Sequence, residues 1–361
     1  MRTYLDHNAT SPLRDSVKQA MRAAMDVEGN ASSLHREGRL AHKLLDDSRE
    51  AIAGAIGALA PMVVFTSGGS EANNMAIRNA PIERILVSAI EHPSVIEAAR
   101  LAHKPAEFIP VNAQGVINLE ALAKMLEGPK ALVSVMLANN ETGAIQPIRE
   151  VVALAQKHGA LVHTDAVQAF GKIPVNFGLL GVDMMTIAAH KVGGPPAIGA
   201  LVLRDGLPFE PFVVGGGQEL RRRAGTENLV AIAGFAALAR ENLLNTTDLR
   251  NQLESSLEGA VIFAQGAERL PNTTNFAHAG LGAETLLMNF DLEGVAVSSG
   301  SACSSGKVTR SHVLTAMGVD ADLARGAIRI SLGWNTTPQN IEHFTRVWRK
   351  LLARHQAKAA A

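Results

Sequence analysis

Five short apolar runs occur before residue 200, each followed by polar residues and, in most cases, by a stretch with helical spacing. They open the segments MVVFTSGGSEANNMAI, RILVSAIEHPSVIEAARLA, ALVSVMLANNETG, ALVHTDAVQAFG and VDMMTIAAHKVGG. Because nearly every position in each run is apolar, the pattern predicts strands buried on both faces of a parallel sheet. Strands that alternate with helices indicate an α/β fold.

Polar clusters follow these predicted strands. In open α/β sheets, ligands bind beyond the carboxyl ends of the strands, so we expect the clusters to converge on one site. Their members are Ser67 to Ser70, Glu91 and His92, Asn139 to Glu141, Asp165 to Gln168, and His190 with Lys191.

The pattern changes after about residue 240. ENLLNTTDLRNQLESSLEG predicts a helix, GVAVSSGSACSSG and GAIRISLGWNT predict strands with loops, and NIEHFTRVWRKLLARH predicts a closing helix. We therefore expect an α+β region here and a domain boundary near residue 245. The predicted large domain spans 13–245, and the predicted small domain combines 1–12 with 246–361.

Composition narrows the classes of function. The 361 residues include 34 basic and 34 acidic side chains, so net charge gives no reason to expect nucleic acid or a membrane surface as partner. A single cysteine cannot form an intrachain disulfide, and the sequence has no CxxC pair that could bind zinc. No apolar run reaches the ~18 residues of a membrane span, and MRTYLDHNATSP has no apolar run behind its single arginine, so we expect no signal peptide there. We expect a soluble, cytoplasmic protein without a resident metal.

Three features point to pyridoxal phosphate chemistry when they occur together. Lys191 follows an apolar strand, where a desolvated amine is a suitable Schiff-base nucleophile. Asp165 ends another strand, and pyridoxal phosphate needs a carboxylate at its ring nitrogen. TSGGSEANN lies between a strand and a helix start, where main-chain N–H groups favour phosphate. Alone, each has an ordinary structural explanation, such as an exposed strand-end lysine or a helix cap.

In order, the chain carries YLDHNATSP, VFTSGGSEANN, EHPSV, ANNETG, HTDAVQ, AAHK, GGGQELRRRAGTEN, SSGSACSSG and IRISLG. At this spacing the chain resembles the cysteine desulfurases of the NifS/IscS type, within the class V aminotransferase group. The resemblance implies pyridoxal-phosphate transferase fold type I. That fold has a large domain, with a mostly parallel seven-stranded sheet flanked by helices, and a smaller α+β domain.

The resemblance also implies roles for residues around the cofactor ring. Lys191 is similar to the Schiff-base lysine that moves the substrate Cα proton, and Asp165 to the partner of the ring nitrogen. Gln168 would donate to the phenolic oxygen. His92 would stack on the ring and assist proton transfer, although a structural histidine at a helix start is the alternative.

Further implied roles concern the phosphate and the substrate. Gly69, Ser70 and His190 would bind the phosphate, and Thr226 would reach the phosphate of a neighbouring subunit, which implies a homodimer. Asn140 would touch both cofactor and substrate.

Arg329 resembles the clamp for the substrate carboxylate. Alternation in AIRISL places Arg329 with Ala327 and Ser331 on one strand face and the isoleucines on the other. A structural salt bridge is the alternative for Arg329. Asn8 is expected at the entrance.

Cys303 is the only thiol and lies among serines and glycines rather than apolar residues. The resemblance implies that it accepts sulfur from L-cysteine as a persulfide, with L-alanine released, and passes it to an iron–sulfur scaffold or another acceptor. Cys303 would at most touch an iron–sulfur cluster transiently. A long loop up to SHVL is typical of the NifS/IscS branch.

Some positions depart from the family pattern. Ala188 stands where a phosphate-binding serine is common, HKVGGPPAIG has an altered turn, and KVTRSHVL lacks a Glu-Pro pair. The sequence stops at LLARHQAKAAA, without the longer tail with which housekeeping members meet their scaffold, so the resemblance does not extend to the mode of partner binding.

Other functions stay open at this point. One is a selenocysteine lyase or small-amino-acid aminotransferase with the same cofactor. Another is a cysteine hydrolase that uses Cys303 with His312 or His92, which leaves Lys191 and Asp165 without a role. The third is a non-catalytic interaction protein.

Overall fold

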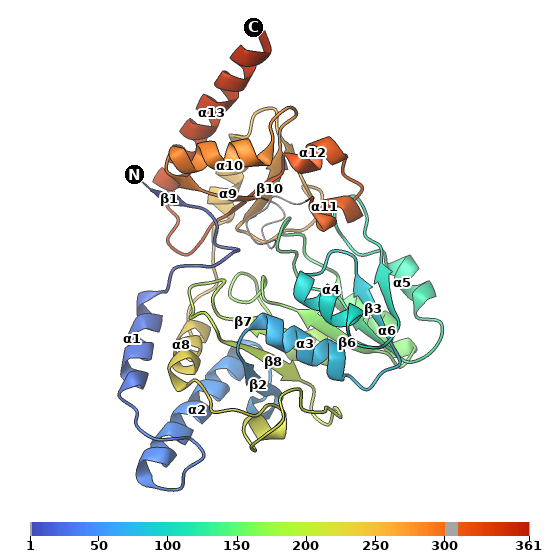
Figure 1. Cartoon of the computed structure of the whole chain (residues 1–361), viewed down its shortest axis with the longest axis vertical. Helices are drawn as coiled ribbons and strands as arrows, with labels where there is room; N and C mark the ends of the chain where they lie inside the picture. Colours follow the sequence, from blue (N-terminus) through green and yellow to red (C-terminus); the bar gives the residue numbers. More distant parts are fainter. Residues whose placement is uncertain (1, 300–309, 361) are drawn as a thin grey trace.

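The computed structural model describes residues 2–299 and 310–360. Its larger sheet (Figure 1) has seven strands within these ranges. In spatial order they are β2 (Val63–Thr66), β8 (Gly199–Leu203), β7 (Met184–Ala188), β6 (Leu161–Asp165), β5 (Ala131–Ser134), β3 (Arg84–Ser88) and β4 (Ala106–Ile109). Strand β8 is antiparallel to both neighbours, and all other pairs are parallel.

Alternate residues of these strands pack against helices on opposite faces. Phe65 and Val133 belong to one apolar cluster, whereas Val64 and Leu132 belong to another. The first cluster includes residues of α1 (Asp15–Met25), α2 (Arg36–Ala55), α5 (Leu119–Met125), α6 (Ile148–Lys157), α7 (Phe177–Leu180) and α8 (Leu229–Ala239). The second includes residues of α3 (Gly69–Asn79) and α4 (Pro93–Arg100). Burial of both faces explains why the strands read as continuous apolar runs.

A smaller antiparallel sheet lies above the first in Figure 1. Its order is β12 (Ser298–Ser299), β13 (Ile328–Ser331), β10 (Thr273–Ala277) and β9 (Val261–Ile262). In the part of the chain that the structure describes, five helices lie around this sheet in Figure 1: α9 (Thr247–Ser255), α10 (Ala283–Leu292), α11 (His312–Ala316), α12 (Ala321–Arg325) and α13 (Pro338–Ala360). The described chain also has two 3₁₀ turns, η1 (Ala60–Met62) and η2 (Glu219–Arg221).

The N-terminal segment joins the two sheets. Strand β1 (Thr3–Tyr4) pairs in parallel with β11 (Val295–Ala296), and the Asn8 amide donates to Ser331 Oγ at 2.9 Å. The main chain then crosses to the large sheet, where Ser11 donates to the His190 carbonyl at 2.8 Å. The first dozen residues therefore bring strand β13 and the turn after β7 together.

The predicted α/β fold with a mostly parallel seven-stranded sheet is confirmed. All five apolar runs form strands of that sheet, and the closing helix is α13. Separate sheets and separate apolar cores support the domain division at residue 245, which stays a prediction. Within the described ranges, we find no helix whose length and apolar character would suit a bilayer span.

Candidate active site

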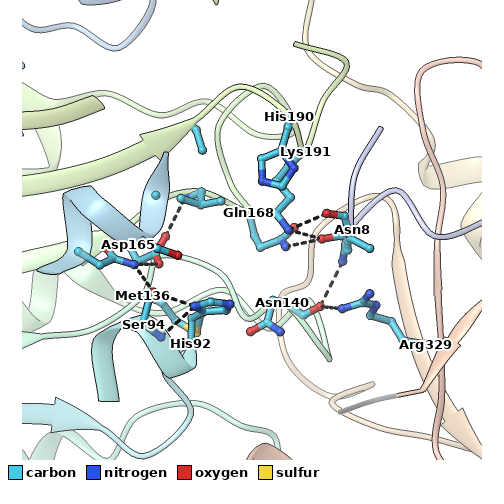
Figure 2. Close-up of a pocket in the computed structure, with 16 residues that line it drawn as sticks. Asn8, His92, Ser94, Met136, Asn140, Asp165, Gln168, His190, Lys191 and Arg329 are labelled. Atoms are coloured by element: carbon cyan, nitrogen blue, oxygen red, sulfur yellow. Dashed lines mark hydrogen bonds between the residues drawn. The ribbon is translucent and has the colours of Figure 1, made fainter. Parts of the chain in front are cut away.

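A cavity of about 310 Å³ opens where the carboxyl ends of the large-sheet strands face β13 and the N-terminal segment (Figure 2). A volume of this size lies within the usual range for small-molecule sites. The sequence-predicted residues that line it are Asn8, Gly69, Ser70, His92, Asn140, Asp165, Gln168, His190, Lys191 and Arg329. Strands that are distant in sequence therefore do bring their polar ends to one place.

Lys191 lies in the turn after β7 and extends into the cavity (Figure 2). Its Nζ donates to the main-chain oxygens of Asn8 at 2.8 Å and Ala9 at 2.9 Å. Both acceptors belong to the N-terminal segment, so this segment places the amine at the cavity wall.

Asp165 ends β6 and is only 4% exposed. Its Oδ2 accepts from Asn73 Nδ2 at 2.7 Å, and its Oδ1 accepts from the Val167 amide at 2.9 Å. Two donors hold the carboxylate in one orientation at the cavity wall, as a group that receives a ligand N–H requires.

His92 begins α4 as its N-cap and also lines the cavity. The Ser94 amide donates to His92 Nδ1 at 3.1 Å, so Nδ1 is an acceptor and the proton of the neutral ring lies on Nε2. Burial lowers the pKa of His92, with a further contribution from the charge on Lys191, while Asp165 raises it. His92 therefore both caps helix α4 and lines the cavity.

One end of the cavity has the features of a phosphate site. Gly69 and Ser70 open α3, whose N-cap Gly68 has φ +146° and provides no side-chain cap. Uncapped N–H groups and the helix dipole favour an anion here. His190 faces the same cavity, and burial, with Lys191 and Lys172, lowers its pKa to about 4, so it is a neutral donor at pH 7.

Gln168 lies in the turn that follows β6 and is buried. Its Nε2 donates to the Asn8 carbonyl at 3.1 Å, and its Oε1 accepts from Lys172 Nζ at 2.7 Å. The Lys172 contact therefore uses the amide oxygen of Gln168 and leaves its amide nitrogen as the hydrogen-bond donor.

Asn8 is a buried junction rather than an entrance residue, which corrects the expectation from sequence. Its Nδ2 donates to the Asn140 carbonyl at 3.3 Å and to Thr273 Oγ1 at 2.9 Å. Its Oδ1 accepts from Lys172 Nζ at 2.7 Å and from Asn272 Nδ2 at 3.1 Å. Asn8 therefore connects the turn after β6 to the small sheet.

Arg329 is 2% exposed, and its strand places Ile328 and Ile330 in the apolar core on the other face, as predicted. One guanidinium nitrogen donates to the Asn140 carbonyl at 3.1 Å, and another to Asp6 Oδ1 at 2.8 Å. Within the described part of the chain, Arg329 Nε is buried without a hydrogen-bond partner. A buried unpaired donor beside a cavity favours an anionic ligand.

Other predicted residues lie elsewhere. Thr226 is exposed and does not line this cavity, and Cys303 lies outside the described residues. His312 also lies outside the cavity lining, where its Nε2 contacts the Glu91 carbonyl at 2.9 Å. Ala188 does line the cavity and has no hydroxyl for a phosphate.

Sequence reasoning missed three contributors. Asn73 bonds Asp165 and Ser94 bonds His92, whereas Lys172 lies behind Gln168. Helical spacing carried a partial signal, because Asn73 comes four residues after Gly69 and Lys172 four residues after Gln168.

A family model described as Aminotransferase class-V matches residues 3–344. This chain belongs to that family. The family and the predicted fold are therefore confirmed.

Individual relatives agree with this membership. "Cysteine desulfurase IscS" of Dictyoglomus turgidum is 39% identical, and the match covers 97% of this chain and 94% of the relative. The X-ray structure of a NifS-like protein from Rickettsia africae superposes with a TM-score of 0.91 at 38% identity, covering 98% of this chain and 100% of that one. A structure described as "SspA in complex with cysteine" has a TM-score of 0.83 at 30% identity, covering 91% and 98%.

Members of this family use pyridoxal 5′-phosphate, and the cavity fits that group. An uncapped helix start suits the phosphate, and an oriented carboxylate, Asp165, suits the ring nitrogen. Gln168 supplies a donor for the phenolic oxygen, and Lys191 an amine for the aldehyde. The donor set thus has a counterpart for each polar end of the cofactor.

Proposed function

We propose that this chain is a pyridoxal-phosphate-dependent cysteine desulfurase that converts L-cysteine to L-alanine and retains the sulfur on Cys303. The observation that carries the proposal is the shared cavity of Lys191, Asp165 and Arg329. It combines an amine, a fixed carboxylate and a guanidinium with one buried N–H unpaired among the described residues. An α-amino acid bound to pyridoxal phosphate requires this set.

The bound cofactor supplies an electron sink for negative charge at the substrate Cα. Asp165, fixed by Asn73, keeps a proton on the pyridine nitrogen. One N–H of Gln168 Nε2 donates to the Asn8 carbonyl, and the other would donate to the phenolic oxygen, while the start of α3 would hold the phosphate. Lys191 Nζ accepts the Cα proton and returns it where protonation is needed.

His92 contributes a neutral ring that carries its proton on Nε2, because Nδ1 accepts from the Ser94 amide. The lowered pKa keeps the imidazole neutral at pH 7, so that it can donate its Nε2 proton. This arrangement suits assistance to proton transfer in the same cavity.

The substrate carboxylate binds Arg329, and Asn140 lies between the guanidinium and the cofactor region. In the sulfur step, the Cys303 thiolate attacks the substrate sulfur, so an S–S bond forms while the substrate C–S bond breaks. The electron pair of that bond stays on carbon, which is protonated to give the methyl group of alanine. L-Cysteine and a thiol thus become L-alanine and a persulfide, without an external oxidant.

The assembly and the cellular role also belong to the proposal. The active unit is a homodimer in which Thr226 completes the neighbouring subunit's site; support comes from its exposed position away from its own cavity. The persulfide passes to an iron–sulfur scaffold or another acceptor protein in the cytoplasm. The positions of Asp165, Arg329 and Lys191 in the cavity do not depend on the homodimer or on the sulfur acceptor.

The function is tested by incubating purified, pyridoxal-phosphate-loaded protein with L-cysteine and a reductant. We expect equal amounts of alanine and sulfide, without any 2-oxo acid. Lys191→Ala should abolish both products. Cys303→Ser should bind cysteine, seen as a change in cofactor absorbance, but release no sulfide.

Other outcomes distinguish the alternatives. Alanine formation that depends on a 2-oxo acid would indicate an aminotransferase, and turnover of selenocysteine alone would indicate a selenocysteine lyase. Full sulfide release by Cys303→Ser would reject the persulfide route. Mixing inactive Lys191→Ala and Thr226→Ala subunits should restore activity, because one site of a mixed dimer keeps both residues; no restored activity at any ratio would reject the shared dimer site.

A further inference from the structure

Lys172 is a buried lysine that the chemistry above does not use. It lies in the turn after β6, four residues beyond Gln168, and only 2% of it is exposed. Lysines are rarely buried without a carboxylate partner. Across the described ranges, Lys172 forms no ion pair; its Nζ contacts Asn8 Oδ1 and Gln168 Oε1, each at 2.7 Å.

Each contact fixes the orientation of the side-chain amide that accepts from Lys172. The Lys172 amine has three N–H donors when protonated and still has two when neutral, so in either state it can donate to both amide oxygens, as it does here. The Gln168 amide then directs Nε2 away from the lysine, where it donates to the Asn8 carbonyl. Asn8 likewise directs Nδ2 to Asn140 and Thr273.

The environment of Lys172 is strongly positive. Lys191 and Arg329 face it, and its own charge acts on His7 and His190. Burial, followed by these two cations, lowers the pKa of Lys172 well below its usual value. A site that tolerates such an amine without a counter-charge indicates a requirement for its hydrogen bonds rather than for packing alone.

We propose that Lys172 is a positioning residue that fixes the amide orientation of Gln168 and Asn8, so that Gln168 presents its nitrogen to the phenolic oxygen of pyridoxal phosphate. The inference rests on the proposed cofactor site. With the opposite orientation, Gln168 would place an oxygen against an oxygen, and the stabilising hydrogen bond would become a repulsion. Lys172 itself does not line the cavity.

The test is a pH titration of the near-visible absorption band of the bound cofactor in the full-length holoprotein. A hydrogen bond to the ionised phenolic oxygen favours that form, so its loss raises the midpoint of the titration. Lys172→Met should raise the midpoint by about one pH unit, the size expected for one lost hydrogen bond. Gln168→Leu should give a similar rise.

The double variant separates positioning from long-range charge. If Lys172 acts through Gln168, then adding Lys172→Met to Gln168→Leu should leave the midpoint unchanged. An equal rise in both backgrounds would overturn the proposal in favour of charge acting through space. No rise in either background would reduce Lys172 to a packing residue.

Two controls keep the result decisive. Lys172→Arg retains donors only and should keep the midpoint near that of the original protein. Lys172→Gln can turn either amide end to its neighbours and should give an intermediate rise, which serves if the Met variant does not fold. A protein that binds no pyridoxal phosphate and shows no band contradicts the proposed function instead.

Discussion

The two walls of the cavity are built differently. On the large-sheet wall, three polar side chains are each held by a second side chain: Asp165 by Asn73, His92 by Ser94 and Gln168 by Lys172. On the small-sheet wall, Arg329 shares its charge with Asp6, which is partly exposed, and keeps one buried N–H unpaired within the described chain.

This difference matches the residence times of two kinds of ligand. A cofactor that stays bound benefits from donors and acceptors fixed in advance, because no reorganisation is needed at each turnover. A substrate that arrives and leaves needs a guanidinium whose partners can be exchanged. We therefore read the large-sheet wall as the cofactor side and the β13 wall as the substrate side.

The largest effect should come from the cofactor side. Asp165→Asn removes the negative charge that keeps the pyridine nitrogen protonated, so we expect kcat to fall by about 10³-fold or more. Asp15→Asn, at an exposed position of α1, is the matched control and should leave kcat unchanged. A normal kcat for Asp165→Asn would contradict the assignment of the two walls.

The stability of the protein should depend on pH through Glu141, a buried carboxyl group next to Asn140. Glu141 follows Asn140, is 3% exposed and accepts from Ser311 Oγ at 2.5 Å. Burial raises its pKa from 4.5 to about 7, so the folded protein keeps a proton that the unfolded chain loses near pH 4.5. This group therefore lowers the free energy of unfolding as pH rises from about 4.5 to 7.

The side chain of the Glu141→Gln variant cannot titrate, so this contribution to the decrease in its free energy of unfolding should be absent. Relative to the original protein, its free energy of unfolding should increase by about 2.5 kcal/mol between pH 5 and pH 8. Urea unfolding of both proteins at the two pH values measures the difference. Parallel changes in the two proteins would show that Glu141 does not titrate in this range.

On the substrate side, Arg329→Gln should mainly weaken binding. Loss of a charge-assisted carboxylate contact is expected to raise KM for cysteine by about 10- to 100-fold. The surface variant Arg204→Gln, which removes an ion pair with Asp183, is the control. An unchanged KM together with loss of stability would instead make Arg329 a structural salt bridge.

The smallest effect should come from Asp6. Asp6→Asn removes a charge that competes with the substrate for Arg329, while the Asn140 carbonyl still holds the guanidinium. We expect KM to decrease by about two- to fivefold, as for a partly exposed ion pair. An increase of tenfold or more would show that Asp6 positions Arg329 rather than competing for it.

Within the described residues, periodicity predicted five of the seven strands of the large sheet, because burial on both faces produces a continuous apolar run. It missed β8, although every residue of that strand is buried, and β4, whose central residues Glu107 and Phe108 are exposed at the sheet edge. Strand alternation correctly placed Arg329 opposite the isoleucines. Residue order and the family motifs suggested Asp165, Gln168 and Lys191.

The remaining site residues depend on contacts between distant segments. Asn8 was expected at the entrance, but its buried bonds to Lys172, Asn272 and Thr273 require three segments to meet. Asp6 reaches Arg329 across 323 positions of sequence. No local pattern encodes such partners, and only the folded chain reveals them.

The central claim, that Lys191 is the amine that holds pyridoxal phosphate, has a direct chemical test. Loaded protein is reduced with borohydride, digested and mapped by mass spectrometry to find the pyridoxyl-bearing lysine. We predict the label on Lys191. Label on Lys172 or another lysine, with Lys191 unmodified, would contradict the account.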